Sequence, residues 1–167
     1  MGWRTITLLA MMAAAAAAQL PEGAKRPGED WVQLFNGRDL TGWRAVGREE
    51  WTVVEGGVLQ GKSVTKEYGY LETERDYRDF TLSLRFKCVG GGNSGIYFHT
   101  RFKPGTVDVN QGAQFEIDCN INRHTGGVYD VERQWLVWPA PDNETVVRPG
   151  EWNEMTVTVV ATVILRD

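Results

Sequence analysis

The chain has 167 residues, with 18 Lys and Arg against 22 Asp and Glu, for a formal net charge of −4 at pH 7. This length suits one domain. No cluster of Lys and Arg accompanies the mildly acidic balance, so neither nucleic acid nor an anionic membrane surface is expected as a partner.

The N-terminus has the layout of a secretory signal. Arg4 precedes the apolar run TITLLAMMAAAAAA, which ends in the small-residue step Ala16-x-Ala18 before Gln19. The run is short for a membrane span and fits a signal cleaved on export. We expect residues 1–18 to be a signal peptide, residues 19–30 a flexible leading segment, and residues 31–167 a single domain. The protein would then be secreted or periplasmic, with no membrane insertion after cleavage.

From Trp31 onward the sequence signals are nearly all strands and turns. WTVVEGGVLQG predicts two short strands around Gly56-Gly57, and DFTLSLRFKCV alternates apolar and polar residues. GIYFHTRF, GAQFEIDCN and EWNEMTVTVVATVIL follow as further strands. Short strands at this spacing, in a chain with 19 glycines, predict an all-β sandwich of two antiparallel sheets.

Two cysteines lie on apolar strand faces. Cys88 is in phase with Phe86, and Cys119 is in phase with Ile117. In an oxidising compartment they could form a disulfide, but a free buried cysteine packs equally well as a small hydrophobe. The spacing leaves both alternatives open.

The segment GAQFEIDCN concentrates polar groups on one side of a strand. Successive strand side chains alternate, so Gln114, Glu116, Asp118 and Asn120 share one face. This face is either solvated or directed at a ligand. The preceding segment GIYFHTRF likewise puts Tyr97, His99 and Arg101 on one face. If the two strands pair, an imidazole, a guanidinium and two carboxylates would converge.

Other candidates lie in loops. Asn93, in the turn GGGNSG, either supplies a turn conformation or contacts a ligand. Tyr129, Trp135 and Trp138 lie in a stretch bounded by Gly and Pro, where they are either core residues or a surface that stacks on sugar rings. His124 is expected to be an exposed loop residue.

The order of seven motifs resembles one family. They are LFNGRDLTGW, WTVVEGGVLQG, GYLETERDYRDFTLSLRFK, GNSGIYFHT, GAQFEIDCN, TGGVYD and RPGEWNEMTV. Together they resemble the 3-keto-disaccharide hydrolases, formerly a domain of unknown function. The resemblance implies an antiparallel jelly-roll sandwich of the concanavalin-A-like type. Family members usually continue past the GEWN strand with a polar turn and further strands. This chain ends in TVTVVATVILRD, which predicts an incomplete C-terminus with Val157 and Val159 at an open edge or without partners across the core.

The resemblance also implies a chemistry. A 3-ketone acidifies the hydrogen on C2 of a sugar, so a base can form an enolate, the C1 oxygen can leave, and water can add back. Glu116 or Asp118 would be the base, Arg101 the enolate stabiliser, and His99 a proton donor or metal ligand. No cofactor is certain, and a divalent metal is compatible with these residues.

The predicted partner is a glycoside or oligosaccharide. The residues expected to bind it are Gln114, Asn93, Tyr97, Tyr129, Trp135 and Trp138. The alternative to a glycoside-cleaving hydrolase or lyase is a non-catalytic, lectin-like carbohydrate-binding module.

Overall fold

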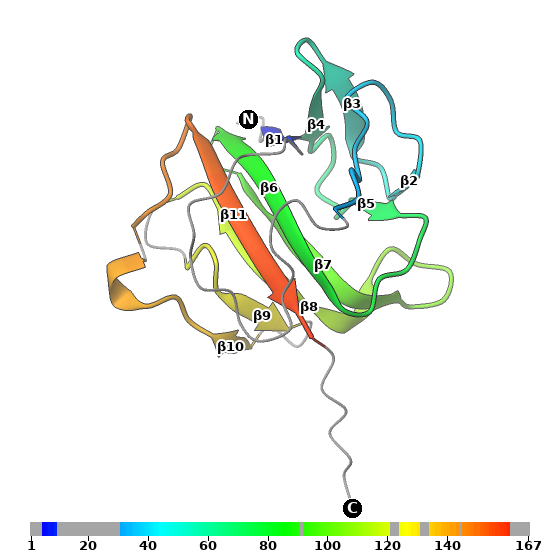
Figure 1. The fold of residues 1–167 in the computed structure, drawn as a ribbon. Helices are drawn as coiled ribbons and strands as arrows, with labels where there is room; N and C mark the ends of the chain where they lie inside the picture. The colour runs from blue at the N-terminus through cyan, green and yellow to red at the C-terminus, as the bar shows by residue number, and fades with distance from the viewer. Residues whose placement is uncertain are drawn as a thin grey trace, which may run out of the picture.

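The computed structural model describes residues 5–9, 31–90, 92–120, 124–130, 134–143 and 145–160. The strands of this part form a five-stranded sheet in the order β11-β6-β1-β4-β3, a four-stranded sheet in the order β10-β9-β8-β7, and the pair β2-β5. Their pairings are antiparallel. Figure 1 shows β6 and β11 crossing in front of β7 and β8.

The strand bounds follow the alternating segments of the sequence. In chain order they are β1 (Thr5–Leu9), β2 (Trp43–Val46), β3 (Glu50–Val54), β4 (Val58–Lys62), β5 (Tyr70–Thr73), β6 (Phe80–Val89), β7 (Asn93–Phe102), β8 (Val109–Asp118), β9 (Val128–Asp130), β10 (Trp135–Val137) and β11 (Trp152–Val159). A 3-10 turn covers Pro141–Asn143. No helix in the described part of the chain is long and apolar enough to cross a bilayer.

The core lies between the two larger sheets. Leu84, Phe86 and Cys88 of β6 are buried against Ile117 at the end of β8 and Cys119 just beyond it. These residues are the apolar phase of each strand, so both sheets turn their apolar faces inward. The predicted all-β sandwich is confirmed, while its jelly-roll connectivity stays a prediction.

A disulfide joins the two sheets. Cys88 in β6 bonds to Cys119 just after β8, with the two Cα atoms 5.3 Å apart. Both cysteines are buried. Of the two alternatives left open by the sequence, pairing is the one that the structure contains.

The backbone of β1 lies in the middle of the five-stranded sheet. Leu8 is opposite Leu59 of β4 on one side and Phe86 of β6 on the other. This strand comes from the segment predicted to be cleaved as a signal. Its removal on export stays a prediction, and residues 10–30 lie outside the described part.

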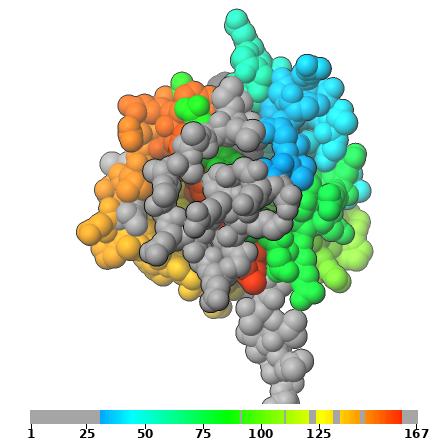
Figure 2. Space-filling view, in the orientation of Figure 1, coloured from blue at the N-terminus to red at the C-terminus, as the bar shows by residue number. Residues whose placement is uncertain are grey.

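The last described strand is an edge strand. Within the described residues β11 pairs with β6, and Val157 and Val159 are both buried. These two side chains are therefore covered, and the incomplete C-terminus stays a prediction. Figure 2 shows the region of β9 to β11 in yellow to orange on one side of the molecule, with residues 31–60 in blue to cyan on the other.

Candidate active site

The polar side of β8 faces away from the core and is nevertheless buried. Gln114, Glu116 and Asp118 have relative exposures of 6%, 6% and 9%. A solvated outer strand would leave such side chains largely exposed, so that alternative is wrong for these three residues. Burial makes a carboxylate costly to ionise, and such carboxylates are enriched at functional sites.

The pairing of the four strands sets rows of side chains across the sheet. One row consists of Tyr97, Gln114, Tyr129 and Trp135. Residues directly opposite one another share a face, so this row lies on the same side as Glu116. In the adjacent row Glu116 lies between Gly95 of β7 and Gly127, whose carbonyl accepts a 2.9 Å hydrogen bond from the Glu116 amide.

Two glycines therefore flank Glu116. A Cβ on Gly95 would overlap the side chain of Gln114, and a Cβ on Gly127 would lie 2.9 Å from the carbonyl oxygen of Val137. Without these Cβ atoms, Gln114 can lean toward Glu116 and the backbone can pass close to β10. The row through Glu116 thus carries one side chain between two glycines. Gln114 occupies the space next to Gly95, and Val137 and Trp135 lie next to Gly127.

Two amide side chains hold the Glu116 carboxylate. Asn93 Nδ2 donates to Glu116 Oε1 and, at 3.1 Å, to Asp118 Oδ2. Gln114 Nε2 donates to Glu116 Oε2 at 3.0 Å and to the carbonyl of Ser94 at 2.9 Å. Asn93 therefore does more than form a turn, because it links both carboxylates.

Glu116 ionises at an unusually high pH. Burial raises its pKa from 4.5 to about 7, and the charge of Asp118 acts in the same direction. The hydrogen bond from Asn93 and the nearby His124 lower the pKa in part. A carboxyl group with a pKa near neutrality is suited to proton transfer.

Asp118 is held more completely than Glu116. Its Oδ1 accepts hydrogen bonds from both the backbone N and the side-chain Nδ2 of Asn120, each 2.7 Å long. The Asp118 amide donates to Thr125 Oγ1 at 2.9 Å, and the Thr125 hydroxyl donates to the Asp118 carbonyl at 3.0 Å. Asp118 thus fastens the chain that follows β8.

An aromatic cluster lies on the β9 and β10 side of the carboxylates. Trp135 packs at 5.1 Å from Tyr129 and 5.7 Å from Trp138, measured between ring centroids. His124 belongs to the same cluster, 4.8 Å from Trp135 and 4.1 Å from Trp138. Trp138 is 56% exposed, so the outer part of the cluster is accessible. We refer to these four residues as the aromatic cluster.

The expectation for His124 was wrong. It is half-buried against two tryptophans rather than an exposed loop residue. Thr125, Gly126 and Gly127, which follow His124, all hydrogen-bond to β8. Loops that bond to a polar strand carry their side chains to that strand's face.

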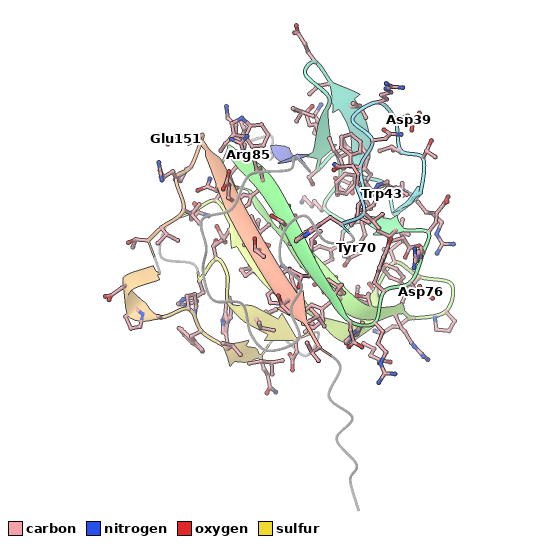
Figure 3. The ribbon with its side chains drawn as sticks, in the orientation of Figure 1. Asp39, Trp43, Tyr70, Asp76, Arg85 and Glu151 are labelled. Carbon is pink, nitrogen blue, oxygen red and sulfur yellow. A yellow bond between two sulfur atoms is a disulfide. The ribbon has the colours of Figure 1, made fainter. Side chains whose placement is uncertain are left out.

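The β7 side of the site is closed by a second group of rings. Tyr97 lies 5.6 Å from Tyr70 of β5, and Tyr70 lies 5.3 Å from Phe102. Burial and, to a smaller extent, the neighbouring Tyr97 raise the pKa of Tyr70 to about 12. Tyr70 and Trp43 are labelled in Figure 3, on the β5 and β2 side of the molecule.

The structure does not bring His99 and Arg101 to the carboxylates. Gly95 is opposite Glu116, and Arg101 follows it by six residues, which corresponds to roughly 20 Å along a strand. His99 is exposed and its Nε2 lies 2.8 Å from the carbonyl oxygen of Arg78. Strict alternation along β7 predicted that both side chains share the face of Glu116, and in the structure neither does.

A β-bulge accounts for this difference. Phe98 pairs with Ala113 and Arg101 with Gln111, so His99 and Thr100 together face the single residue Gly112. His99 has a φ of 51° and Gly112 a φ of 122°. One extra residue reverses the alternation beyond it. Consequently Phe102, rather than Arg101, joins Tyr97 beside Tyr70.

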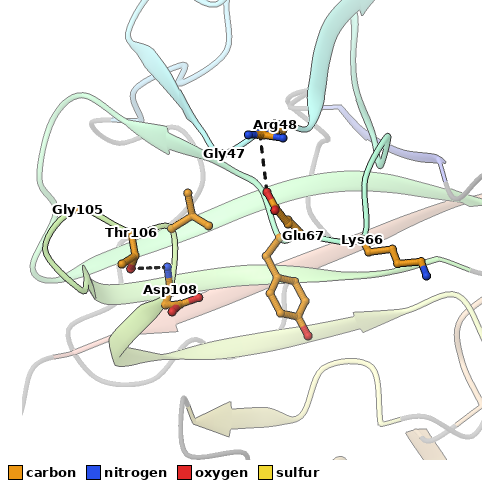
Figure 4. A pocket seen from close by; sticks show the side chains of 9 residues that line it. Gly47, Arg48, Lys66, Glu67, Gly105, Thr106 and Asp108 are labelled. Carbon is orange, nitrogen blue, oxygen red and sulfur yellow. Dashed lines mark hydrogen bonds and ion pairs between the residues drawn. The ribbon is translucent and has the colours of Figure 1, made fainter.

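A separate pocket lies at the other end of the four-stranded sheet. It has a volume of about 760 Å³ and is lined by Gly47, Arg48, Lys66, Glu67, Tyr68, Gly105, Thr106, Val107 and Asp108 (Figure 4). The loop of the β7–β8 hairpin supplies four of these residues, and Arg48 pairs with Glu67 at 3.9 Å. None of the predicted site residues lines it.

The described residues include no group of three or more His, Cys, Asp or Glu side chains placed to hold a metal ion. The structure therefore does not change the expectation from the sequence about a divalent metal.

The fold and the site define an all-β sandwich domain with two buried carboxylates on one strand face. The family model described as the 3-keto-alpha-glucoside-1,2-lyase-like domain matches residues 30–164, so the chain belongs to this family. A curated relative from Bacteroides thetaiotaomicron, named 3-keto-disaccharide hydrolase, is 24% identical over 171 residues. The match covers 84% of this chain and 55% of the relative, so the chain spans about half of that protein's length. The resemblance inferred from the motifs is confirmed.

Proposed function

We propose that this protein cleaves the glycosidic bond of 3-keto-glycosides by elimination followed by hydration. The family match and the name of the relative support the substrate class. The observation that carries the chemistry is the buried Glu116, which lies between two glycines and has a pKa raised to about 7.

The reaction requires one strong base. Glu116 takes the proton from C2, and the C2–H electron pair forms an enolate with the 3-ketone. The enolate then re-forms the 3-ketone and a C1–C2 double bond while the C1–O bond breaks. The electron pair of the C1–O bond leaves with the departing oxygen, which takes up a proton. Water adds to C1 and a proton returns to C2, so the net change is hydrolysis.

Hydrogen bonding favours Glu116 over Asp118 as this base. Each Glu116 oxygen accepts one hydrogen bond, from Asn93 or from Gln114, and so keeps a lone pair for a proton. Asp118 is held by more donors, because its Oδ1 accepts two hydrogen bonds from Asn120 and its Oδ2 accepts one from Asn93. Asp118 would hold the site together and, through its charge, keep Glu116 basic.

Arg101 cannot stabilise the enolate from its place beyond the bulge. Asn93 donates to both carboxylates from the edge of the site, which makes its amide the donor best placed for the developing oxyanion. Gln114 fixes Glu116 from the opposite oxygen. Tyr129, Trp135 and Trp138 would bind the sugar rings by stacking, as the exposure of Trp138 allows.

Export to the periplasm or outside the cell is part of the proposal. The Cys88–Cys119 disulfide supports it, since such bonds persist in oxidising compartments. The basic and apolar N-terminus supports it as well.

A lectin-like binding module is the second candidate, favoured by the accessible aromatic cluster. It differs from the enzyme in one respect, because binding alone needs no base. A Glu116→Gln variant of a lectin would bind and release the same intact sugar as the wild type.

The test is turnover of a 3-keto-disaccharide by the purified chain, followed as released 3-keto-monosaccharide. Glu116→Gln should reduce kcat/KM by about 10²-fold or more, in line with the usual contribution of a general base. Glu55→Gln, in the exposed β3–β4 turn, is the matched control and should leave the rate unchanged. Full activity in Glu116→Gln would contradict the assignment, and binding without turnover by the wild type would favour the lectin.

A further inference from the structure

His124 lies where the carboxylates meet the aromatic cluster. Its ring contacts Trp138 and Trp135 at centroid distances of 4.1 and 4.8 Å. Its charge acts on Glu116 and lowers the pKa of that carboxyl. The imidazole is therefore close enough to the proposed base to interact with it electrostatically while standing on the side of the accessible tryptophans.

The backbone holds His124 in a fixed position. Its carbonyl accepts a 2.8 Å hydrogen bond from the amide of Gly127, and Gly126 N donates to the carbonyl of Glu116 at 2.9 Å. Thr125 bonds twice to Asp118. His124 has a φ of 61°, a left-handed conformation that is uncommon for residues other than glycine. Such conformations persist when the surrounding structure fixes them, and they are enriched at functional sites.

The two sides of Glu116 are not equivalent. On the β7 side, Tyr97 packs against Tyr70, which in turn packs against Phe102. On the other side, a Cβ on Gly127 would lie 3.0 Å from the ring of Trp135, and Trp138 of the same cluster is 56% exposed. A sugar bound with C2 over Glu116 would direct its leaving group toward this exposed tryptophan. The glycosidic oxygen, one bond from C1, would then lie on the side of His124.

We propose that His124 is the catalytic acid that protonates the departing glycosidic oxygen. This rests on the proposed function and completes its proton balance. Glu116 removes the C2 proton, the C1–O bond breaks with its electron pair on oxygen, and the imidazolium of His124 supplies the proton to that oxygen. The neutral imidazole then recovers a proton from solvent.

The test uses two substrates that differ only in how much help the leaving group needs. A 3-keto-disaccharide releases a sugar hydroxyl, which must be protonated to leave well. A 4-nitrophenyl 3-keto-glucoside releases a phenolate that is stable without a proton. The variants are His124→Asn and, as the matched control, His99→Asn. Both histidines have left-handed backbones, which Asn tolerates, and His99 is exposed at the bulge.

His124→Asn should lower kcat/KM for the disaccharide by about 10²-fold or more and for the nitrophenyl substrate by less than about 10-fold, as expected for loss of a general acid. His99→Asn should change neither. If His124→Asn lowered kcat/KM equally for both substrates, the inference would be overturned, while the proposed role of Glu116 as the base would stand. A wild-type chain that cleaves neither substrate would overturn the proposed function itself, and the inference with it.

Discussion

At the scale of single residues, the account depends on the ionisation of Glu116. A base works only when deprotonated, and burial raises the pKa of this carboxyl to about 7. The ascending limb of activity against pH should therefore be centred near 7. The measurement is kcat/KM as a function of pH, taken at substrate concentrations well below KM. The rates are corrected for spontaneous breakdown of the 3-keto substrate. An ascending limb centred near 4.5, the ordinary value, would show that Glu116 is not the base.

Sequence alternation predicted one half of this site and misplaced the other. Gln114, Glu116 and Asp118 lie on one face because β8 is regular over these positions. His99 and Arg101 were assigned to the same face by the same rule, which a single bulge invalidates. His124 was missed because loop residues have no periodicity from which a face can be predicted.

At the scale of elements, the bulge in the β7–β8 hairpin has a testable cause. Gly112 has a φ of 122°, and a Cβ there would lie 2.9 Å from the carbonyl oxygen of Phe98 and 3.1 Å from Thr100. Gly105, in the hairpin loop, has a φ of 74° with no atom within 4 Å of its Cβ position. Gly105→Ala should cost only the left-handed conformation, about 1–2 kcal/mol.

Gly112→Ala should lower the free energy of unfolding by clearly more than Gly105→Ala, because it adds a steric clash in the ladder. Urea unfolding of both variants measures the difference. Equal losses would mean that the bulge can rearrange, and His99 and Arg101 would then be free to adopt the regular alternation.

The elements that the sequence predicted are the long, alternating ones, such as β6 and β8. The strands β9 and β10 have three residues each, too few for a period to be detected. They are formed by tertiary pairing, of β9 with β8 and of β10 with β9, rather than by local propensity. Because Tyr129 and Trp135 lie on these strands, the position of their rings near Glu116 could not be predicted.

At the scale of the whole molecule, the Cys88–Cys119 disulfide ties the two sheets across the core. It closes a loop with a sequence separation of 31. Replacing both cysteines by Ala should lower the free energy of unfolding by about 2–5 kcal/mol, through a less constrained unfolded chain and lost packing. Denaturant unfolding of the double variant checks this. A loss below about 1 kcal/mol would mean that the sheets are held by the remaining core alone.

The sandwich as a whole was the most predictable feature, because each long strand has an apolar phase of sufficient bulk to fill a core. The order of the strands was not predictable from the same pattern. Alternation indicates which face of a strand is buried but not which strand lies beside it, and the place of β1 between β4 and β6 illustrates this. The strand neighbours decide which loops meet at Glu116.

The most direct test of the central claim is the fate of the C2 hydrogen when a 3-keto-disaccharide is cleaved in D₂O. Elimination removes this hydrogen and hydration replaces it from solvent, so the early 3-keto-monosaccharide product should carry deuterium at C2 by NMR and mass spectrometry. Product incubated alone, and substrate with Glu116→Gln, give the background exchange. Cleavage that leaves the original hydrogen on C2 above this background would contradict an elimination route with Glu116 as its base.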